Sequence, residues 1–107
     1  MSQFNEYHEF VKGTKKYPEK NAIIYPALGL CGEAGEIAEK IKKWLRGDKG
    51  PEIDKQALLK ELGDPLWYIT SLADDLGFTL QEVVNANIEK LTSRKERGVL
   101  KGDGDDR

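Results

Sequence analysis

The stretch that decides the fold reads Leu28-Gly-Leu-Cys-Gly-Glu33-Ala-Gly-Glu36 and, after 24 further residues, Glu61-Leu-Gly-Asp64-Pro-Leu-Trp-Tyr68. Each half holds two acidic residues at positions i and i+3. In an α-helix, residues three apart are neighbours on one face. Each acidic pair is therefore a potential two-pronged set of oxygen ligands.

Apolar residues recur at helical spacing around both pairs and predict one buried face for each segment. The first stripe is Leu30, Ala34, Ile37, Ala38, Ile41, Trp44 and Leu45, and the second is Leu58, Leu62, Leu66, Ile69, Ala73 and Leu76. Both acidic pairs lie on the same shoulder of their stripe, and Tyr68 lies there too. If the two helices pack antiparallel, four carboxylates line one cleft.

Four neighbouring carboxylates repel one another unless a cation neutralises them. Hard divalent cations such as Mg²⁺ or Mn²⁺ prefer oxygen ligands and would do so. The alternative is a solvated helix flank, with Glu33 and Glu36 near a helix start where negative charge is favourable. Two pairs on matching shoulders, each with a glycine between its acids, favour the metal site over the flank.

The composition is that of one folded domain. The chain has 107 residues, 38% of them hydrophobic and 34% charged, with 19 acidic and 17 basic side chains and a net charge of −2. This balance gives no reason to expect a nucleic-acid partner. No apolar run is long enough to span a membrane, and no signal-peptide core is present, so we expect a cytoplasmic protein. The predicted domain covers residues 1–98, and residues 99–107 read as a flexible tail rich in Gly and Asp.

Four helices are expected, at residues 2–12, 27–46, 52–76 and 80–97. Ser2 is a candidate N-cap for the first, Gly47 a C-terminal stop for the second, and Thr79-Leu80-Gln81-Glu82 a capping box for the last. Pro65 leaves two possibilities for the third. The helix either kinks there or stops at Leu62 and restarts with Asp64 as N-cap. Because the apolar stripe stays in phase across Pro65, we favour the kink.

Several single residues carry expectations of their own. Cys31 is expected to be a small core thiol, and His8 an aromatic filler of the first helix. Trp67 points away from its stripe and indicates a partner subunit. In the last helix Asn87 and Arg94 fall on the apolar stripe, with Lys90 on its shoulder. Buried polar groups need partners, which are either the acidic helices or a bound phosphate chain.

These motifs resemble the MazG-type all-α nucleoside triphosphate pyrophosphohydrolases. The resemblance rests on Glu33-x-x-Glu36, Glu61-x-x-Asp64 and Asn87-Ile-Glu-Lys-Leu-Thr-Ser-Arg94, in that order, and covers roughly residues 25–98. Pro65 departs from it, since an aliphatic residue is expected there. The resemblance implies an antiparallel bundle of about four helices, completed by oligomerisation as a homodimer or homotetramer. The MazG-type family is also related to the dimeric dUTPases.

The implied activity is hydrolysis of a ribo- or deoxyribonucleoside triphosphate to the monophosphate and pyrophosphate. By that similarity Glu33, Glu36, Glu61 and Asp64 hold Mg²⁺, with Mn²⁺ as a substitute, and Glu33 or Glu36 activates water. The implied substrate-binding residues are Lys43, Trp44, Tyr68, Asn87, Lys90 and Arg94. Two alternatives remain: a non-catalytic helical dimerisation or regulatory module, and a related phosphoribosyl-ATP-type pyrophosphohydrolase. For the base, Tyr7, His8, Tyr17 and Tyr25 are the stacking candidates, or else the partner subunit.

Overall fold

A computed structural model describes residues 2–98, which form four α-helices, one short 3-10 helix and no β-strand. The helices are α1 (Gln3–Thr14), α2 (Ile24–Arg46), α3 (Lys55–Asp75) and α4 (Leu80–Arg97), and the 3-10 helix is η1 (Glu19–Asn21). The predicted all-α fold is confirmed. The tail predicted to be flexible, residues 99–107, lies outside the described residues.

Helix ends follow the capping chemistry expected from the sequence. The Ser2 hydroxyl accepts a hydrogen bond from the Asn5 backbone N–H at 3.1 Å. The Thr79 and Glu82 side chains form the complete capping box at the start of α4. Gly47 ends α2 in the left-handed conformation at φ 75°, which glycine adopts without a steric penalty. Each of these three local predictions is confirmed.

Both long helices begin at other residues than predicted. Helix α2 starts at Ile24 rather than Ala27, because a proline such as Pro26 is tolerated in the first turn, where its missing N–H is not needed. The preceding Ile23 has a φ of 71°, and its N–H donates to the Asp75 carboxylate at 2.9 Å. Helix α3 starts at Lys55 rather than Glu52, since Asp54 caps it by accepting the Ala57 N–H at 3.1 Å.

Helix α3 runs through Pro65 without a break, so the alternative in which it stops and restarts is wrong. Asp64 is an interior helical residue and not an N-cap. The continuous apolar stripe packs α3 along α2, and this packing outweighs the one backbone hydrogen bond that a proline removes. The Asp64 carboxylate is consequently available to other partners.

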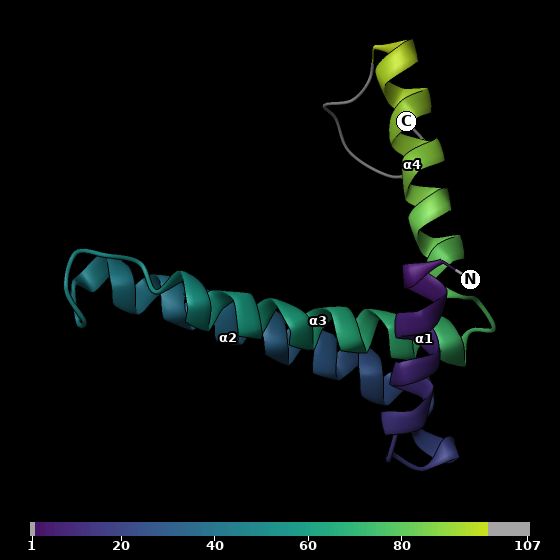
Figure 1. Ribbon diagram of the computed structural model, residues 1–107, viewed down its shortest axis with the longest axis horizontal. Coiled ribbons are helices and arrows are strands. Elements are labelled where there is room, and N and C mark those ends of the chain that lie inside the picture. Colours follow the sequence, from purple (N-terminus) through teal and green to yellow (C-terminus); the bar gives the residue numbers. More distant parts are fainter. Residues whose placement is uncertain (1, 99–107) are drawn as a thin grey trace.

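Helices α2 and α3 form a long antiparallel hairpin, and α1 lies across the end where α2 begins and α3 ends (Figure 1). Helix α4 starts at this same end and projects away from the hairpin. None of the helices among residues 2–98 has the length and apolarity needed to cross a membrane.

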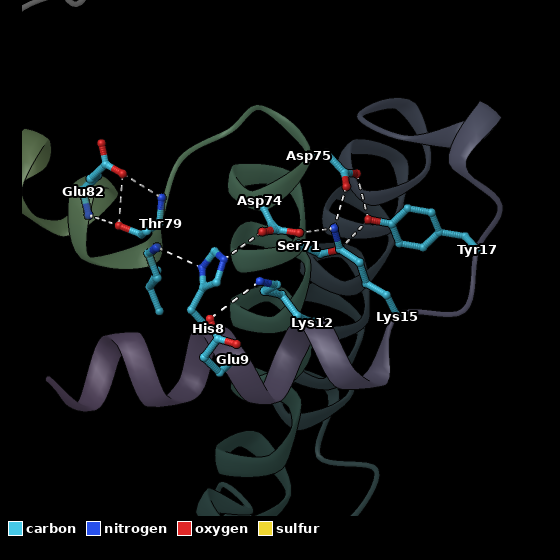
Figure 2. Close-up of polar contacts among 11 residues, drawn as sticks. His8, Glu9, Lys12, Lys15, Tyr17, Ser71, Asp74, Asp75, Thr79 and Glu82 are labelled. Atoms are coloured by element: carbon cyan, nitrogen blue, oxygen red, sulfur yellow. Dashed lines mark hydrogen bonds and ion pairs between the residues drawn. The ribbon is translucent and has the colours of Figure 1, made fainter. Parts of the chain in front are cut away.

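The end of the hairpin is fastened by a polar network shared by three helices (Figure 2). His8 on α1 is buried; its Nε2 lies 2.9 Å from an Asp74 oxygen on α3, and its Nδ1 accepts the Leu80 N–H of α4 at 3.1 Å. Lys15 contacts both Asp74 and Asp75, at 2.7 and 2.6 Å. His8 is thus a hydrogen-bonded junction residue as well as an aromatic filler.

The apolar core of one chain is small. Only Val11, Ala73 and Leu80 are buried among the described apolar side chains other than proline. Many residues of the two predicted stripes are exposed instead, including Leu45, Leu62, Leu66 and Leu76, and Ile88 and Leu91 on α4 are exposed as well. The stripe periodicity is present, but a single chain does not cover these stripes.

The expectation for Cys31 is wrong, and the one for Trp67 loses its basis. Cys31 is exposed and is not a core thiol, because it lies on the side of α2 that α3 does not cover. Trp67 is half-buried within the chain: its indole N–H donates to the Thr14 hydroxyl at 2.7 Å, and its ring packs edge-on against Tyr68. The wheel placed Trp67 away from α2 correctly, but α1 occupies that side, so Trp67 gives no evidence of a partner.

Candidate metal centre

Three carboxylates gather across the α2–α3 hairpin. One oxygen each of Glu33, Glu61 and Asp64 lies within 4.8 Å of the others. Glu33 comes from α2 and the other two from α3, and Asp64 is the most exposed of the three. The antiparallel packing therefore produces the predicted meeting of the two acidic motifs.

A close approach of the two helices lies next to this cluster. Gly29 on α2, one turn before Glu33, faces the ring of Tyr68 on α3, one turn after Asp64. A Cβ atom at position 29 would overlap the Tyr68 ring, with Cε1 its nearest atom. The absence of a side chain at Gly29 thus lets Tyr68 lie against the α2 backbone beside the acidic residues.

Burial and charge repulsion both act on the titratable groups of this cluster. Partial burial raises the pKa of the Glu33 carboxyl, and the negative charges of Asp64, Glu61 and Glu36 raise it further. Burial also raises the pKa of Tyr68, with additional contributions from Tyr25 and then from Glu33 and Asp64. These shifts have the sign expected for anions held together without a neutralising cation.

The donor set fits a hard divalent cation. Carboxylate oxygens are the ligands that Mg²⁺ prefers. Three side chains offer one such oxygen each, and these oxygens lie within 4.8 Å of one another. Glu33, Glu61 and Asp64 are the residues that would hold the ion.

Glu36 differs from the other three predicted ligands. It is exposed, and it is not among the three carboxylates whose oxygens meet. Its charge nevertheless contributes to the raised pKa of Glu33, so it lies at the edge of the cluster. Glu36 therefore lies beside the three-carboxylate cluster rather than within it.

A pocket of about 120 Å³ lies nearer the loop that joins α2 to α3, lined by Lys40, Lys43, Trp44 and Lys49 among others. The Trp44 indole N–H donates to the Pro51 carbonyl at 3.0 Å and closes this end of the hairpin. Lys40 also reaches Glu61, with 3.9 Å between Nζ and Oε1. The predicted residues Lys43 and Trp44 thus line one pocket, next to the carboxylates.

The predicted residues of the last helix lie elsewhere in the single chain. Asn87 is exposed, contrary to the expectation that it is buried, and it lines an open hollow on α4 with Lys90 and Phe78. The wheel position of Asn87 was inferred from a stripe that α4 does not bury in this chain. Arg94 is buried as predicted, with 4% of its surface exposed. Helix α4 projects away from the hairpin that holds the carboxylates (Figure 1).

Lys40 and Lys49 line the pocket that contains Trp44, although the sequence did not single them out as candidate site residues. Lys40 carries a usable signal, because it follows Glu36 by four residues and so continues the same helical face. Lys49 gives none, since it lies in the loop between the helices and its position depends on how that loop folds back.

Comparison with known proteins identifies relatives of this chain. Two relatives align over most of the chain: the Gene 37 protein of Mycobacterium phage L5 is 48% identical over 87 residues, which are 79% of this chain and 76% of that protein. The Uncharacterized protein YvdC of Bacillus subtilis (strain 168) is 38% identical over 74 residues, 63% of this chain and 70% of that protein. No solved structure gives a significant match. The family model of the MazG nucleotide pyrophosphohydrolase domain matches residues 26–99, which include both acidic motifs, and the chain belongs to this family.

Proposed function

We propose that this protein is a Mg²⁺-dependent nucleotide pyrophosphohydrolase that converts a ribo- or deoxyribonucleoside triphosphate to the monophosphate and pyrophosphate. The observation that carries the proposal is the meeting of Glu33, Glu61 and Asp64 across the hairpin. Family membership supplies the class of reaction. Mn²⁺ is the expected substitute, because it shares the preference for oxygen ligands.

The chemistry requires charge neutralisation and positioning more than a covalent nucleophile. A bound Mg²⁺ supplies neutralisation of phosphate charge and lowers the pKa of water. The bond that forms joins a water oxygen to the α-phosphorus, and the bond that breaks links the α-phosphorus to the oxygen bridging to the β-phosphate. Pyrophosphate leaves with that oxygen.

Glu36 is the better candidate for the residue that takes the proton of the attacking water. A general base needs a lone pair that is not already committed to another ligand. Glu33 lies inside the group that would hold the ion, whereas Glu36 lies at its edge. Glu36 lies outside the ligand set and is therefore assigned the role of accepting the proton of the attacking water.

We propose further that a second copy of the chain completes the molecule, as a homodimer or homotetramer. The radius of gyration is 16.8 Å, against about 13 Å for a compact domain of this size. Leu28, Leu59, Leu62 and Ile88 are each more than half exposed. Burying an exposed side chain of this kind completely contributes roughly 1.5–3 kcal/mol, so association through these side chains is favoured. A second copy is also the means of bringing Asn87, Lys90 and Arg94 toward a substrate.

The test is pyrophosphate release from a panel of ribo- and deoxyribonucleoside triphosphates with Mg²⁺, with and without a chelator. We expect Glu36→Gln and Glu61→Gln to lower kcat by at least about 100-fold, the usual contribution of a general base or a metal-binding group. Glu39→Gln is the matched control, because Glu39 lies on the same helix but pairs with Lys42 at 3.0 Å. It should keep full activity.

Retention of activity in Glu61→Gln, or release that is indifferent to the chelator, would contradict the proposal. The absence of turnover with every triphosphate, together with a melting temperature that Mg²⁺ leaves unchanged, would favour the non-catalytic helical module instead.

A further inference from the structure

One imidazole ring joins the start of α4 to α1 and α3. His8 on α1 is buried, and it is the single histidine of the chain. Its Nδ1 lies 3.1 Å from the backbone nitrogen of Leu80, the first residue of α4, and its Nε2 lies 2.9 Å from an Asp74 oxygen on α3 (Figure 2). The state of this one ring therefore bears on how three helices are held together.

The tautomer of the ring follows from its partners. A backbone N–H can only donate, so Nδ1 accepts the Leu80 N–H through its lone pair. The proton of the neutral ring is then on Nε2, where it donates to the Asp74 carboxylate. A second proton has no site other than Nδ1. The imidazolium form of His8 and its hydrogen bond with Leu80 consequently exclude each other.

The place of Leu80 in α4 adds weight to this hydrogen bond. The first N–H groups of a helix have no partner within the helix. In α4 the Thr79 hydroxyl accepts the Glu82 N–H at 3.1 Å, whereas the Leu80 N–H is satisfied by His8. Leu80 is 3% exposed, so loss of its acceptor leaves a buried donor unpaired. The positive end of the α4 dipole also disfavours a cation at this point.

The charges around the ring do not offset these effects. Asp74 attracts an imidazolium, but Lys15 already pairs with it at 2.7 Å. Burial acts to raise the pKa of Asp74, and the hydrogen bonds from Lys15 and His8 outweigh burial and lower it. Asp74 is therefore ionised throughout the range in which a histidine titrates. The other charged groups near the ring are paired as well: Glu9 with Lys12, Asp75 with Lys15, and Glu82 with the Thr79 N–H.

Helix α4 leaves the rest of the molecule from this joint. It starts beside α1 and then projects away from the α2–α3 hairpin (Figure 1). The contacts at its start thus help to set the direction in which its later residues, Asn87 and Lys90 among them, are presented. A change at His8 is transmitted along the length of α4.

We propose that His8 is a pH-dependent latch for α4. The neutral ring holds Leu80 against α1 and α3, and protonation at Nδ1 releases the start of α4 while Nε2 keeps its contact with Asp74. The docked arrangement is fully favoured where the imidazole is neutral, and it is lost as the pH falls through the range in which the ring takes up a second proton. The latch does not depend on the proposed reaction, because its readouts are structural.

The experiment follows the Leu80 amide and the His8 ring by NMR in the full chain, between about pH 8 and about pH 5.5, a range that spans the titration of histidine. Hydrogen exchange at Leu80, relative to the intrinsic rate at each pH, measures its protection. This protection should fall by at least about tenfold in the wild type, because the neutral fraction of a titrating ring falls tenfold per pH unit. The fall should coincide with the change in the nitrogen chemical shifts of the ring.

The Glu82 amide is the internal control. It lies in the same turn of α4 but is held by the Thr79 hydroxyl, which does not titrate in this range. Its protection should stay within about twofold, which would show that α4 remains helical when its start is released.

His8→Gln keeps the two contacts without a titrating group. The glutamine oxygen accepts the Leu80 N–H and its amide group donates to Asp74, and neither changes charge with pH. Leu80 protection in this variant should vary by less than about twofold over the same range. His8→Ala removes both contacts and should give low Leu80 protection at every pH.

Constant Leu80 protection in the wild type would overturn the latch. So would protection that persists after the ring nitrogens report protonation, or a pH dependence in His8→Gln equal to that of the wild type. The first two results are read from the wild type, so the outcome does not depend on the folding of either variant.

Discussion

At the scale of single residues, Glu33 is both a candidate metal ligand and a charge that neighbouring carboxylates repel. Its carboxylate is one of the three that meet across the hairpin, and burial together with the charges of Asp64, Glu61 and Glu36 raises its pKa. An acid whose pKa is higher in the folded state than in the unfolded state contributes stability that is fully present below the unfolded pKa. That contribution is lost as the pH rises through the folded pKa. At neutral pH Glu33 therefore destabilises the metal-free protein.

Glu33→Gln should raise the melting temperature of the metal-free protein at pH 7, by about 2 °C. The gain should be smaller at pH 4, because the raised pKa of Glu33 favours the protonated, uncharged form of the wild-type carboxyl as the pH falls. Mg²⁺ should then stabilise the variant less than the wild type, because one ligand is lost. Thermal unfolding at the two pH values, at one protein concentration, measures all three effects.

Glu39→Gln is the control of opposite sign. The hydrogen bond from Lys42 lowers the pKa of Glu39, so replacing it should leave the melting temperature unchanged or slightly lower. A lower melting temperature for metal-free Glu33→Gln would show that repulsion in the cluster is not a significant destabilising interaction.

At the scale of helices, the site depends on how closely α2 and α3 approach. The apolar stripes set the pairing, and Gly29 permits the contact with Tyr68 that adjoins the carboxylates. The three glycines of α2 at positions 29, 32 and 35 look alike in the sequence. They differ in the structure, since only position 29 faces another side chain within 4 Å.

Gly29→Ala should destabilise the protein by about 1–3 kcal/mol, the usual effect of overpacking, and should weaken Mg²⁺ binding because Tyr68 is displaced. Gly32→Ala should instead stabilise by about 0.5–1 kcal/mol, since alanine is the better helix former and nothing lies in its way. Urea unfolding of the two variants measures the contrast. The same sign of change in both would mean that the Gly29–Tyr68 contact does not limit the approach of the helices.

At the scale of the whole molecule, the exposed stripes and the projecting α4 are the dominant features (Figure 1). Three buried apolar side chains, apart from proline, are a small core for 97 described residues, and domains of this size are only marginally stable even when compact. The proposed second copy accounts for both features.

Light scattering of the wild type should give a mass of at least twice the 12.1 kDa of the chain. Ile88→Lys should shift the protein toward the monomer and lower its melting temperature, because a charge then lies on the exposed apolar stripe of α4, where Ile88 is 58% exposed.

Glu89→Lys is the matched control for this change. It introduces the same side chain one position later, about 100° around the helix and away from the stripe. It should leave the mass unchanged. A wild type that is monomeric at all concentrations, or equal effects of the two variants, would count against association through α4.

The sequence alone determined whatever depends on neighbours along the chain. The capping residues Ser2, Thr79 and Gly47, the four helices and the i, i+3 spacing within each acidic motif all follow from local hydrogen bonding and helical periodicity. It also indicated the family, because the motifs of the site lie in order within residues 26–99.

Tertiary structure decided what depends on contacts between distant segments. His8 became a buried junction because Asp74 and Leu80 meet it from two other helices, and Trp67 turned inward because α1 covers its side of α3. Periodicity shows which face of a helix is apolar but not what covers that face. For that reason Asn87 and about half of the predicted stripe residues are exposed in the single chain, whereas Cys31 is exposed because it lies outside the apolar stripe of α2.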